Sequence, residues 1–312
     1  MQRALPFLEL LVSKIDLYQS VTNRIVAALE AGAPPWVCPW SGGPGASAPA
    51  NLGSGRPYRG INVLLLNFQA MLGGYPVNRW LTYCQAQALG AQVRRGEQGT
   101  QVVFFKLLEV EGRQPCNAPS PADPKVVPLL RSFTVFNAAQ IDGLSPGLLP
   151  VPPSADWMPI DEAEAMLSRS GAHIRHGGDR AYYHPAQDLI QLPERGRFEG
   201  SEAYYRVALH ELTHWSGHAA RCNRPLQGRQ HIEAYAFEEL VAEIGSAFLC
   251  GHCGLPGSLQ HASYVEHWLQ ALRSDRRLIF TAAAQAQKAA DYLLADRVPT
   301  AAAQALQAAG AA

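Results

Sequence analysis

His210-Glu211-Leu212-Thr213-His214 places two histidines four residues apart, with a glutamate directly after the first. On a helix, positions i and i+4 share a face, so both imidazoles can reach a single metal ion. Glu211 is offset by about a hundred degrees around the helix, where it can face a metal-bound water. Two neutral ligands, a general base and room for water are what metal-assisted hydrolysis requires. The segment therefore predicts a metal-dependent hydrolytic site in the C-terminal half.

The residues around this motif favour a helix. The segment SEAYYRVAL at 201–209 has apolar residues at helical spacing, and Gly217 beyond the second histidine is typical of a helix end. The alternative is a surface helix with two ordinary histidines, because a five-residue pattern also arises by chance. The helical context weakens that alternative.

A third ligand is expected from a second helix at 234–249, AYAFEELVAEIGSAFL. Glu239 and Glu243 lie one turn apart on it among apolar residues, and buried carboxylates need a partner. The arrangement resembles that of gluzincins, in which one carboxylate binds the metal and another orients a ligating histidine. We expect Glu239 to be the ligand and Glu243 the orienting carboxylate, with Glu238 in solvent.

Other side chains compete for roles at this site. His218 follows His214 too closely to be a ligand if the helix ends at Gly217, whereas His231 and Tyr235 are alternative candidates for a transition-state contact. A His-His-Glu set suits Zn²⁺, with Mn²⁺ or another divalent metal as the alternative.

Length and charge bound the kind of protein. The 312 residues suffice for two domains and have a formal net charge of zero, but residues 1–143 sum to +4 and residues 144–312 to −4. The basic half favours a polyanion as partner. No apolar stretch has the length of a membrane span, and the N-terminus lacks the features of a signal peptide, so a cytoplasmic protein without membrane contact is expected.

Cysteine usage adds little chemistry. The six cysteines are scattered, which argues against a disulfide framework. Cys250 and Cys253 form a C-x-x-C pattern at a helix end instead of at a strand-to-helix turn, so we expect a structural or incidental role.

Periodicity and turn residues predict an α+β protein in four parts. These are a small α+β domain at 1–143, a linker at 144–155, a mainly helical domain with a small sheet at 156–298, and an Ala-rich tail at 299–312. In the first domain we expect helices at 17–29, 63–71 and 80–90, a hairpin at 93–106, a loop at 109–128, and a strand at 131–137 pairing with 102–107.

In the second domain we expect a helix at 161–170, strands at 174–176, 180–184 and 188–193, and helices at 264–269 and 273–294. The strand at 188–193 immediately precedes the motif helix. We expect it to present an edge to an extended peptide substrate.

The first domain has no enzymatic motif, but it is rich in cations and aromatic rings. Arginine and lysine can follow phosphates, and aromatic faces can stack unpaired bases. The candidates for contact with single-stranded DNA are Arg56, Tyr58, Arg59, Asn62, Trp80, Tyr83, Arg94, Arg95 and Lys106. The alternative is that the tryptophans are core residues and the arginines a solvated rim.

Several long segments resemble antirestriction proteins of the ArdC class. They are PPWVCPW, GRPYRGIN, WLTYCQAQALGAQVRRGEQGTQVVFFK and FTVFNAAQIDG in the first half, and DLIQLPERGRF, ALHELTHWSGH, YAFEELVAEIGSAFLC and WLQALRSDRRLIFTAAAQAQKAADYL in the second. Together they cover most of residues 16–295.

The resemblance implies an N-terminal domain that binds single-stranded DNA and a C-terminal zincin-like (gluzincin) metallopeptidase domain. It also implies a role in shielding incoming mobile DNA from host restriction, with a host restriction component as one candidate protein substrate. His210, His214 and a glutamate of EELVAE would hold the metal, and Glu211 would be the base. Two alternatives stay open: a non-catalytic DNA-binding or decoy protein with a structural metal, and a DNA-processing accessory factor.

Overall fold

The computed structural model describes residues 5–36, 48–110, 125–149, 159–226, 232–255 and 264–295. In the N-terminal half these form α1 (Leu5–Glu30), β1 (Ala50–Asn51), α2 (Ile61–Gly73), β2 (Arg79–Thr82), α3 (Tyr83–Ala88), β3 (Gln92–Val93), β4 (Thr100–Val110), β5 (Lys125–Asn137) and β6 (Ile141–Asp142). The C-terminal half contains α4 (Pro159–Ser170), β7 (His173–His176), β8 (Tyr182–His184), β9 (Leu189–Leu192), α5 (Ser201–Ser216), α6 (Ile232–Cys253), α7 (Val265–Ser274) and α8 (Leu278–Leu294). This is the predicted α+β class; the boundaries at the linker stay a prediction.

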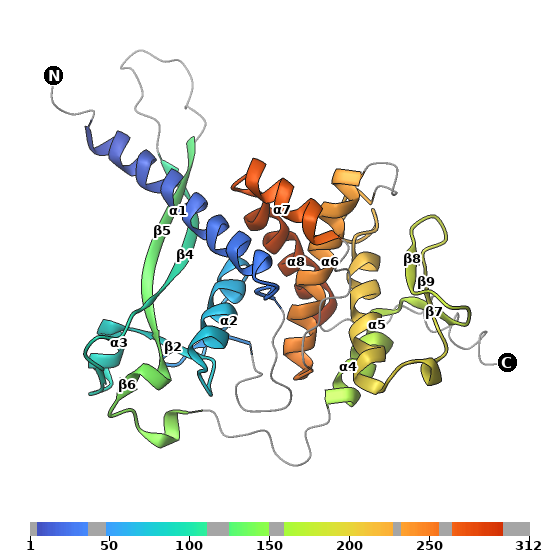
Figure 1. Ribbon diagram of the computed structural model, residues 1–312, viewed down its shortest axis with the longest axis horizontal. Coiled ribbons are helices and arrows are strands. Elements are labelled where there is room, and N and C mark those ends of the chain that lie inside the picture. Colours follow the sequence, from blue (N-terminus) through green and yellow to red (C-terminus); the bar gives the residue numbers. More distant parts are fainter. Residues whose placement is uncertain are drawn as a thin grey trace.

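The N-terminal sheet has the order β1-β2-β5-β4, with β1 and β2 parallel and the other pairs antiparallel. The predicted pairing of the strand at 131–137 with 102–107 is confirmed, because Val102 lies opposite Phe133 in this register. β4 and β5 continue as a long twisted ribbon away from α2 (Figure 1). The outer residues of the loop expected at 109–128 are therefore strand, and residues 111–124 lie outside the described residues.

Two local predictions in this half are wrong. Residues 79–82 are strand, and the helix begins only at Tyr83, because Thr82 and Gln85 form a reciprocal capping box there. The segment at 93–106 is not a hairpin: β3 pairs with β6 in a separate two-stranded sheet, whereas β4 pairs with β5. Periodicity shows that residues are extended but does not identify their partner strand.

The C-terminal sheet has the order β7-β9-β8, with β9 parallel to β7 and antiparallel to β8. All four residues of β9 are buried. The expected peptide-binding edge at 188–193 is therefore wrong, because the edge strands are β7 and β8. Three of its four residues are apolar, and the amide of the fourth, Gln191, is hydrogen-bonded to Arg175 and to the Gly177 carbonyl, as burial on both faces of a strand requires.

The helix expected at 273–294 is interrupted. α7 ends at Ser274, and α8 starts at Leu278, because the Asp275 side chain accepts a hydrogen bond from the Arg277 backbone N–H (2.8 Å). Aspartate bonded to the backbone two residues on forms a turn that competes with a helix.

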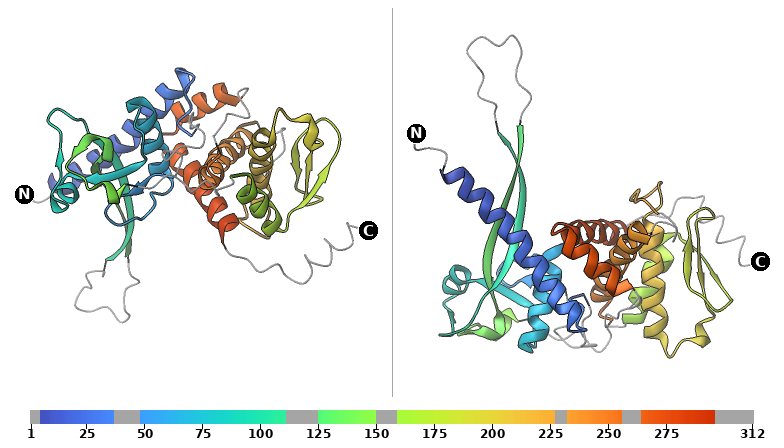
Figure 2. Two further views of the ribbon diagram at one scale, coloured as in Figure 1. Left: turned by 90° about the horizontal axis from the view of Figure 1, so that it is seen from below. Right: turned by 45° about the horizontal axis from the view of Figure 1, so that its top comes forward.

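The two halves share one hydrophobic core. Buried side chains of α1 and α2 pack with those of α6, α7 and α8, and the rings of Trp36 and Trp268 meet edge to face with centroids 5.9 Å apart. Figure 2 shows α8 lying between the N-terminal elements and α5. The two halves are therefore joined through packed helices, and Trp36 is a core residue.

A second core lies within the C-terminal half, between α4, α5, β9 and the end of α6. Cys250 and Cys253 lie in it, and burial raises the pKa of each thiol to about 12. Their position agrees with the expected structural role. Among the described residues, no helix is both long and apolar enough to cross a membrane.

Candidate metal centre and nucleic-acid surface

Two helices pack closely enough to bring the motif and the acidic segment together. His210 and His214 lie in the last two turns of α5, which ends at Ser216 before Gly217. Gly245 of α6 faces Thr213, where an added Cβ would lie 2.5 Å from the threonine Cγ2. The absence of a side chain at Gly245 therefore permits the close contact between the helices.

Three side chains converge between these helices. The distance from His210 Nε2 to His214 Nε2 is 3.2 Å, and Glu239 Oε2 lies 3.5 Å from the first nitrogen and 3.7 Å from the second. Tetrahedral ligands about 2.1 Å from a zinc ion lie roughly 3.4 Å from one another. Among the described residues these three form the group of donors able to hold a metal ion, and they fit one in both chemistry and spacing.

The carboxylate that contacts His214 is Glu238, not a solvated residue as expected from the sequence. Glu238 is buried, and its Oε1 lies 3.1 Å from His214 Nδ1. Arg224, also buried, donates to both Glu238 oxygens at 2.7 and 2.9 Å, and additionally to Ser216 Oγ and the Thr213 carbonyl. The expectation for Glu238 was wrong because the end of α5 and the turn after it cover its side of α6.

Glu243 is buried one turn beyond Glu239 on α6. For His214, the carboxylate in contact is Glu238 and not Glu243. A role of Glu243 toward His210 stays a prediction. Residue type and spacing indicate that α6 supplies carboxylates, but the position of α5 determines which one meets which histidine.

Electrostatics at the site favour a cation. Burial lowers the pKa of His214, but hydrogen bonds and charges from Glu238 and Glu239 outweigh burial and raise the pKa to about 10. Burial raises the pKa values of the Glu238 and Glu239 carboxyls. Hydrogen bonds and charges from the histidines, and for Glu238 also from Arg224, outweigh burial and hold both pKa values below their ordinary range. Two buried carboxylates therefore remain ionised at neutral pH beside the histidines, which suits a divalent metal.

The other residues predicted for this centre are not among the three converging donors. Glu211 is buried on α5 beside His210 and is not one of the three converging donors, as a general base requires. Tyr235 lies one turn before Glu239, and its ring is 5.6 Å from that of Tyr264. His231 lies outside the described residues.

Four predicted DNA-contact residues line a single groove of about 1170 Å³ between the N-terminal sheet and α8. They are Arg56, Tyr58, Arg59 and Asn62. Asn62 also exchanges two hydrogen bonds with the Val103 backbone, at 2.7 and 2.8 Å, so its amide holds α2 against β4.

The remaining candidates are dispersed. Trp80 is fully buried, and its Nε1 donates to Asn78 Oδ1 (2.7 Å), so predicting it as a base-stacking residue was wrong. Tyr83, Arg94 and Arg95 line a different hollow beside the β3–β6 sheet, where Arg94 forms ion pairs with Glu97 and Asp142. Lys106 lies in β4, and its side chain is outside the described residues.

Sequence reasoning missed four further residues of the groove. Phe104 and Phe133 stand side by side on the ribbon, 47% and 46% exposed, whereas Arg277 is the N-cap residue of α8 and Lys288 lies within that helix. The helical periodicity of α8 could have predicted an exposed stripe. Its position opposite the N-terminal sheet depends on the tertiary fold.

The fold and the site define a zincin-like metallopeptidase domain joined to an α+β N-terminal domain. Residues 161–285 match the family model of the zincin-like metallopeptidase, and residues 15–136 match that of the N-terminal domain of anti-restriction factor ArdC.

The chain belongs to the ArdC family of antirestriction proteins, which confirms the resemblance. It is 44% identical to the antirestriction ArdC protein from plasmid R388, whose metal-free crystal structure it matches with a TM-score of 0.74 over 89% of this chain and 96% of that one. The Mn(II)-bound crystal structure of that protein matches with a TM-score of 0.72, 44% identity and coverage of 89% and 97%.

Curated relatives extend this picture. The chain is 43% identical over 289 residues to the uncharacterized protein y4eC of Sinorhizobium fredii (strain NBRC 101917 / NGR234), covering 90% of this chain and 92% of that protein. It is 43% identical over 298 residues to DNA primase TraC of Escherichia coli, with 90% of this chain covered but only 27% of the primase. The chain thus spans about a quarter of that primase's length.

Membership implies two general properties. A zincin-like domain implies a divalent metal, and an ArdC N-terminal domain implies contact with nucleic acid. The Mn(II) ion was found in the crystal structure of the R388 protein.

Proposed function

We propose that this protein protects mobile DNA from restriction by binding single-stranded DNA and by hydrolysing a protein target, a host restriction component being one candidate, at a metal-dependent peptidase site. We assign His210, His214 and Glu239 as metal ligands, Glu211 as general base, and Zn²⁺ as the metal, with Mn²⁺ as the alternative. The observation that supports this most is the triangle of donor atoms with sides of 3.2, 3.5 and 3.7 Å.

The side chains around this triangle have distinct roles in the proposal. A divalent ion held there would supply Lewis acidity toward a peptide carbonyl and water. Glu211 accepts the proton of the attacking water and returns it to the leaving amine. Glu238 accepts a hydrogen bond from His214 Nδ1, which fixes the imidazole with Nε2 toward the ion. Arg224 holds Glu238 in place through two hydrogen bonds.

A non-catalytic protein with a structural metal is the second candidate. The observation in its favour is burial: the side chains of His210 and Glu239 are 1% and 2% exposed, and that of His214 is 12% exposed. A structural zinc site is closed by its protein ligands, whereas a catalytic site keeps a position for water.

A cleavage assay that compares the wild type with the variant Glu211→Gln separates the two candidate functions. The intact protein, loaded with Zn²⁺ or Mn²⁺, is incubated with a denatured lysate from a restriction-proficient host, and new peptide termini are identified by mass spectrometry. We expect cuts with the wild type and with Glu233→Gln, an exposed glutamate on α6, and a loss of at least a hundredfold with Glu211→Gln. Equal cutting by Glu211→Gln would contradict the peptidase mechanism. Metal retention with no cutting by any of the proteins would favour the second candidate.

A further inference from the structure

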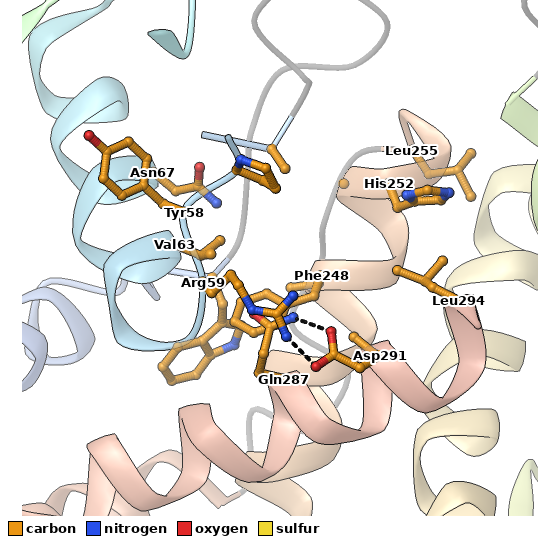
Figure 3. Close-up of a pocket in the computed structure, with 16 residues that line it drawn as sticks. Tyr58, Arg59, Val63, Asn67, Phe248, His252, Leu255, Gln287, Asp291 and Leu294 are labelled. Carbon is orange, nitrogen blue, oxygen red and sulfur yellow. Dashed lines mark hydrogen bonds and ion pairs between the residues drawn. The ribbon is translucent and has the colours of Figure 1, made fainter. Parts of the chain in front are cut away.

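The groove between the N-terminal sheet and α8 has walls from both halves of the molecule. The β4–β5 ribbon and the loop before α2 form one wall, and α8 of the metallopeptidase domain forms the other. The Gly60 backbone N–H donates to Gln287 Oε1 (2.9 Å), and Arg59 forms an ion pair with Asp291. Figure 3 shows Arg59 reaching Asp291 beside Gln287, where a smaller pocket adjoins the groove. These contacts fix the spacing of the two walls.

One stripe of α8 faces the groove. The exposed positions that line the groove are the N-cap residue Arg277 and, within α8, Thr281, Ala284, Lys288 and Asp291, at successive spacings of four and three residues. The opposite face of α8, with Ile279, Ala283, Ala286 and Ala290, is fully buried in the two cores. The side chains of the stripe are therefore held at fixed positions by a well-packed helix.

The opposite wall exposes an aromatic pair. Phe104 and Phe133 are 47% and 46% exposed, and their centroids are 6.3 Å apart. Both lie on the sheet face that contains Val102, because Phe133 is opposite Val102 and Phe104 is two residues further along β4. Exposed phenylalanines cost free energy in water, whereas an unpaired base can stack on them.

The charge of the lining is positive. Its cationic side chains are Arg56, Arg59, Arg277 and Lys288, and its carboxylate is Asp291. Arg277 and Lys288 stand about 16 Å apart along α8, from the helical rise of 1.5 Å per residue. Separated cations on one wall and flat rings on the other match a strand with phosphates on one side and bases on the other.

We propose that single-stranded DNA binds in this composite groove, with bases on Phe104 and Phe133 and phosphates on Arg277 and Lys288 of the metallopeptidase domain. The inference rests on the proposed function and extends it, because α8 becomes half of the DNA site. Duplex DNA offers no free base faces to the rings. An acidic peptide would satisfy the cations but leave the rings without stacking partners.

The test is fluorescence anisotropy of a labelled oligo-dT with the full-length protein. Phe104→Leu and Phe133→Leu keep an apolar side chain but remove the ring, and we expect each to weaken binding roughly tenfold. Arg277→Gln and Lys288→Gln should each reduce the slope of log affinity against log salt by about 0.7. Matched controls are Tyr182→Leu (42% exposed) in β8 and Arg180→Gln two residues before it, both outside the lining of the groove. They should bind as the wild type does, and thermal unfolding should show that all variants are folded.

Three outcomes would contradict the binding of single-stranded DNA in this groove. The first is wild-type affinity for oligo-dT in all four groove variants. That result would contradict the groove as the binding site but not the proposed binding of single-stranded DNA. The second is equal affinity for an oligo-dT and its duplex, and the third is displacement of the oligonucleotide by polyglutamate as effective as by unlabelled oligo-dT. Absence of any oligo-dT binding at low salt would instead contradict the proposed function together with this inference.

Discussion

At the scale of single residues, Glu238 determines how the metal centre is held. Its carboxylate joins His214 to Arg224, and all three side chains lie largely out of solvent, with exposed fractions of 7%, 12% and 2%. A buried arginine and a buried carboxylate require each other, since either alone would be an uncompensated charge. The bidentate contact also fixes the plane of the carboxylate that His214 faces.

Glu238→Gln should therefore weaken both metal binding and the fold. We expect metal affinity to fall roughly 10- to 100-fold and the free energy of unfolding to fall by about 3 kcal/mol because Arg224 loses its counter-charge. Metal titration and urea unfolding measure the two effects. Glu233→Gln, exposed on the same helix, is the control. If Glu238→Gln bound metal as tightly as this control, Glu238 would have no orienting role.

Asp188 connects the C-terminal sheet to the turn after α5. It accepts hydrogen bonds from Arg221 Nη1 (2.9 Å) and from Tyr183 Oη (2.8 Å). Burial raises its pKa, but these hydrogen bonds and the charge of Arg221 outweigh burial and lower the pKa. A lowered folded-state pKa stabilises the protein above the unfolded pKa of about 3.9, and this stabilisation is lost as the pH falls through the folded value.

Asp188→Asn should consequently destabilise the protein in a pH-dependent way. We expect a loss of roughly 1 kcal/mol or less at pH 7, because the carboxylate is partly exposed, and a much smaller difference from wild type below about pH 3. Asparagine tolerates the positive φ of 49° at this position, so the backbone is not the cause. Urea unfolding at both pH values is the measurement, with exposed Asp179→Asn as control. The same difference at both pH values would rule out the ionised carboxylate as its source.

At this scale the sequence predicted the converging donors but not the residues that hold them. Helical spacing places His210 and His214 on one face, and burial of acidic residues identifies α6 as the source of the third donor. Arg224 lies in an irregular segment after α5, where no periodicity exists to predict its direction. Its role follows only from the fold of that segment against α6.

At the scale of elements, the packing of α5 on α6 brings the donors within reach of one another. Gly245 lies against Thr213, whose Oγ1 donates to the Leu209 carbonyl (2.8 Å) and so keeps its methyl group toward the glycine. Protein interiors do not accommodate an extra methyl group without strain.

Gly245→Ala should destabilise the protein although alanine favours helices. We expect a net loss of about 1 kcal/mol, since a gain of roughly 1 kcal/mol in helix propensity is outweighed by overpacking of about 1–3 kcal/mol. Thermal unfolding measures it. Gly251→Ala on the same helix meets no atom within 4 Å and should be neutral or stabilising. Thr213→Ser in the Gly245→Ala background should restore stability, and failure to do so would refute the proposed steric cause.

Elements were predictable where periodicity alone defines them, as for the helices α5 and α6. The arrangement of an element was not predictable where it depends on the strand or helix with which the element pairs. Strand β3 pairs with β6, which is distant in sequence, and β9 takes the middle of its sheet because it pairs with both of the strands that precede it. The same limit applies to α8, whose buried and exposed stripes are periodic but whose partner across the groove is not.

At the scale of the whole molecule, the shared core makes the two halves dependent on each other. Leu65 of α2 is fully buried in the same cluster as Leu240 and Ile244 of α6, the helix that also contains Glu239. The sequence predicted two parts joined by a linker, because composition shows a linker but not a core formed across it.

Leu65→Ala should accordingly loosen the C-terminal half. A buried leucine replaced by alanine costs about 2–5 kcal/mol, and we expect faster hydrogen exchange, read by mass spectrometry, in α6 and α8 as well as in α2. Leu72→Ala, 63% exposed on the same helix, should leave exchange unchanged. Faster exchange confined to the N-terminal half would show that the halves are stabilised independently.

We propose that His210, His214 and Glu239 hold one divalent metal ion, and the metal stoichiometry of the purified 312-residue chain tests this most directly. Elemental analysis after dialysis against Zn²⁺ or Mn²⁺ should give one ion per wild-type chain and per His218→Ala chain. It should give none for His210→Ala or Glu239→Ala, with circular dichroism showing that both are folded. Wild-type metal content in folded Glu239→Ala, or no metal in the wild type, would contradict the account.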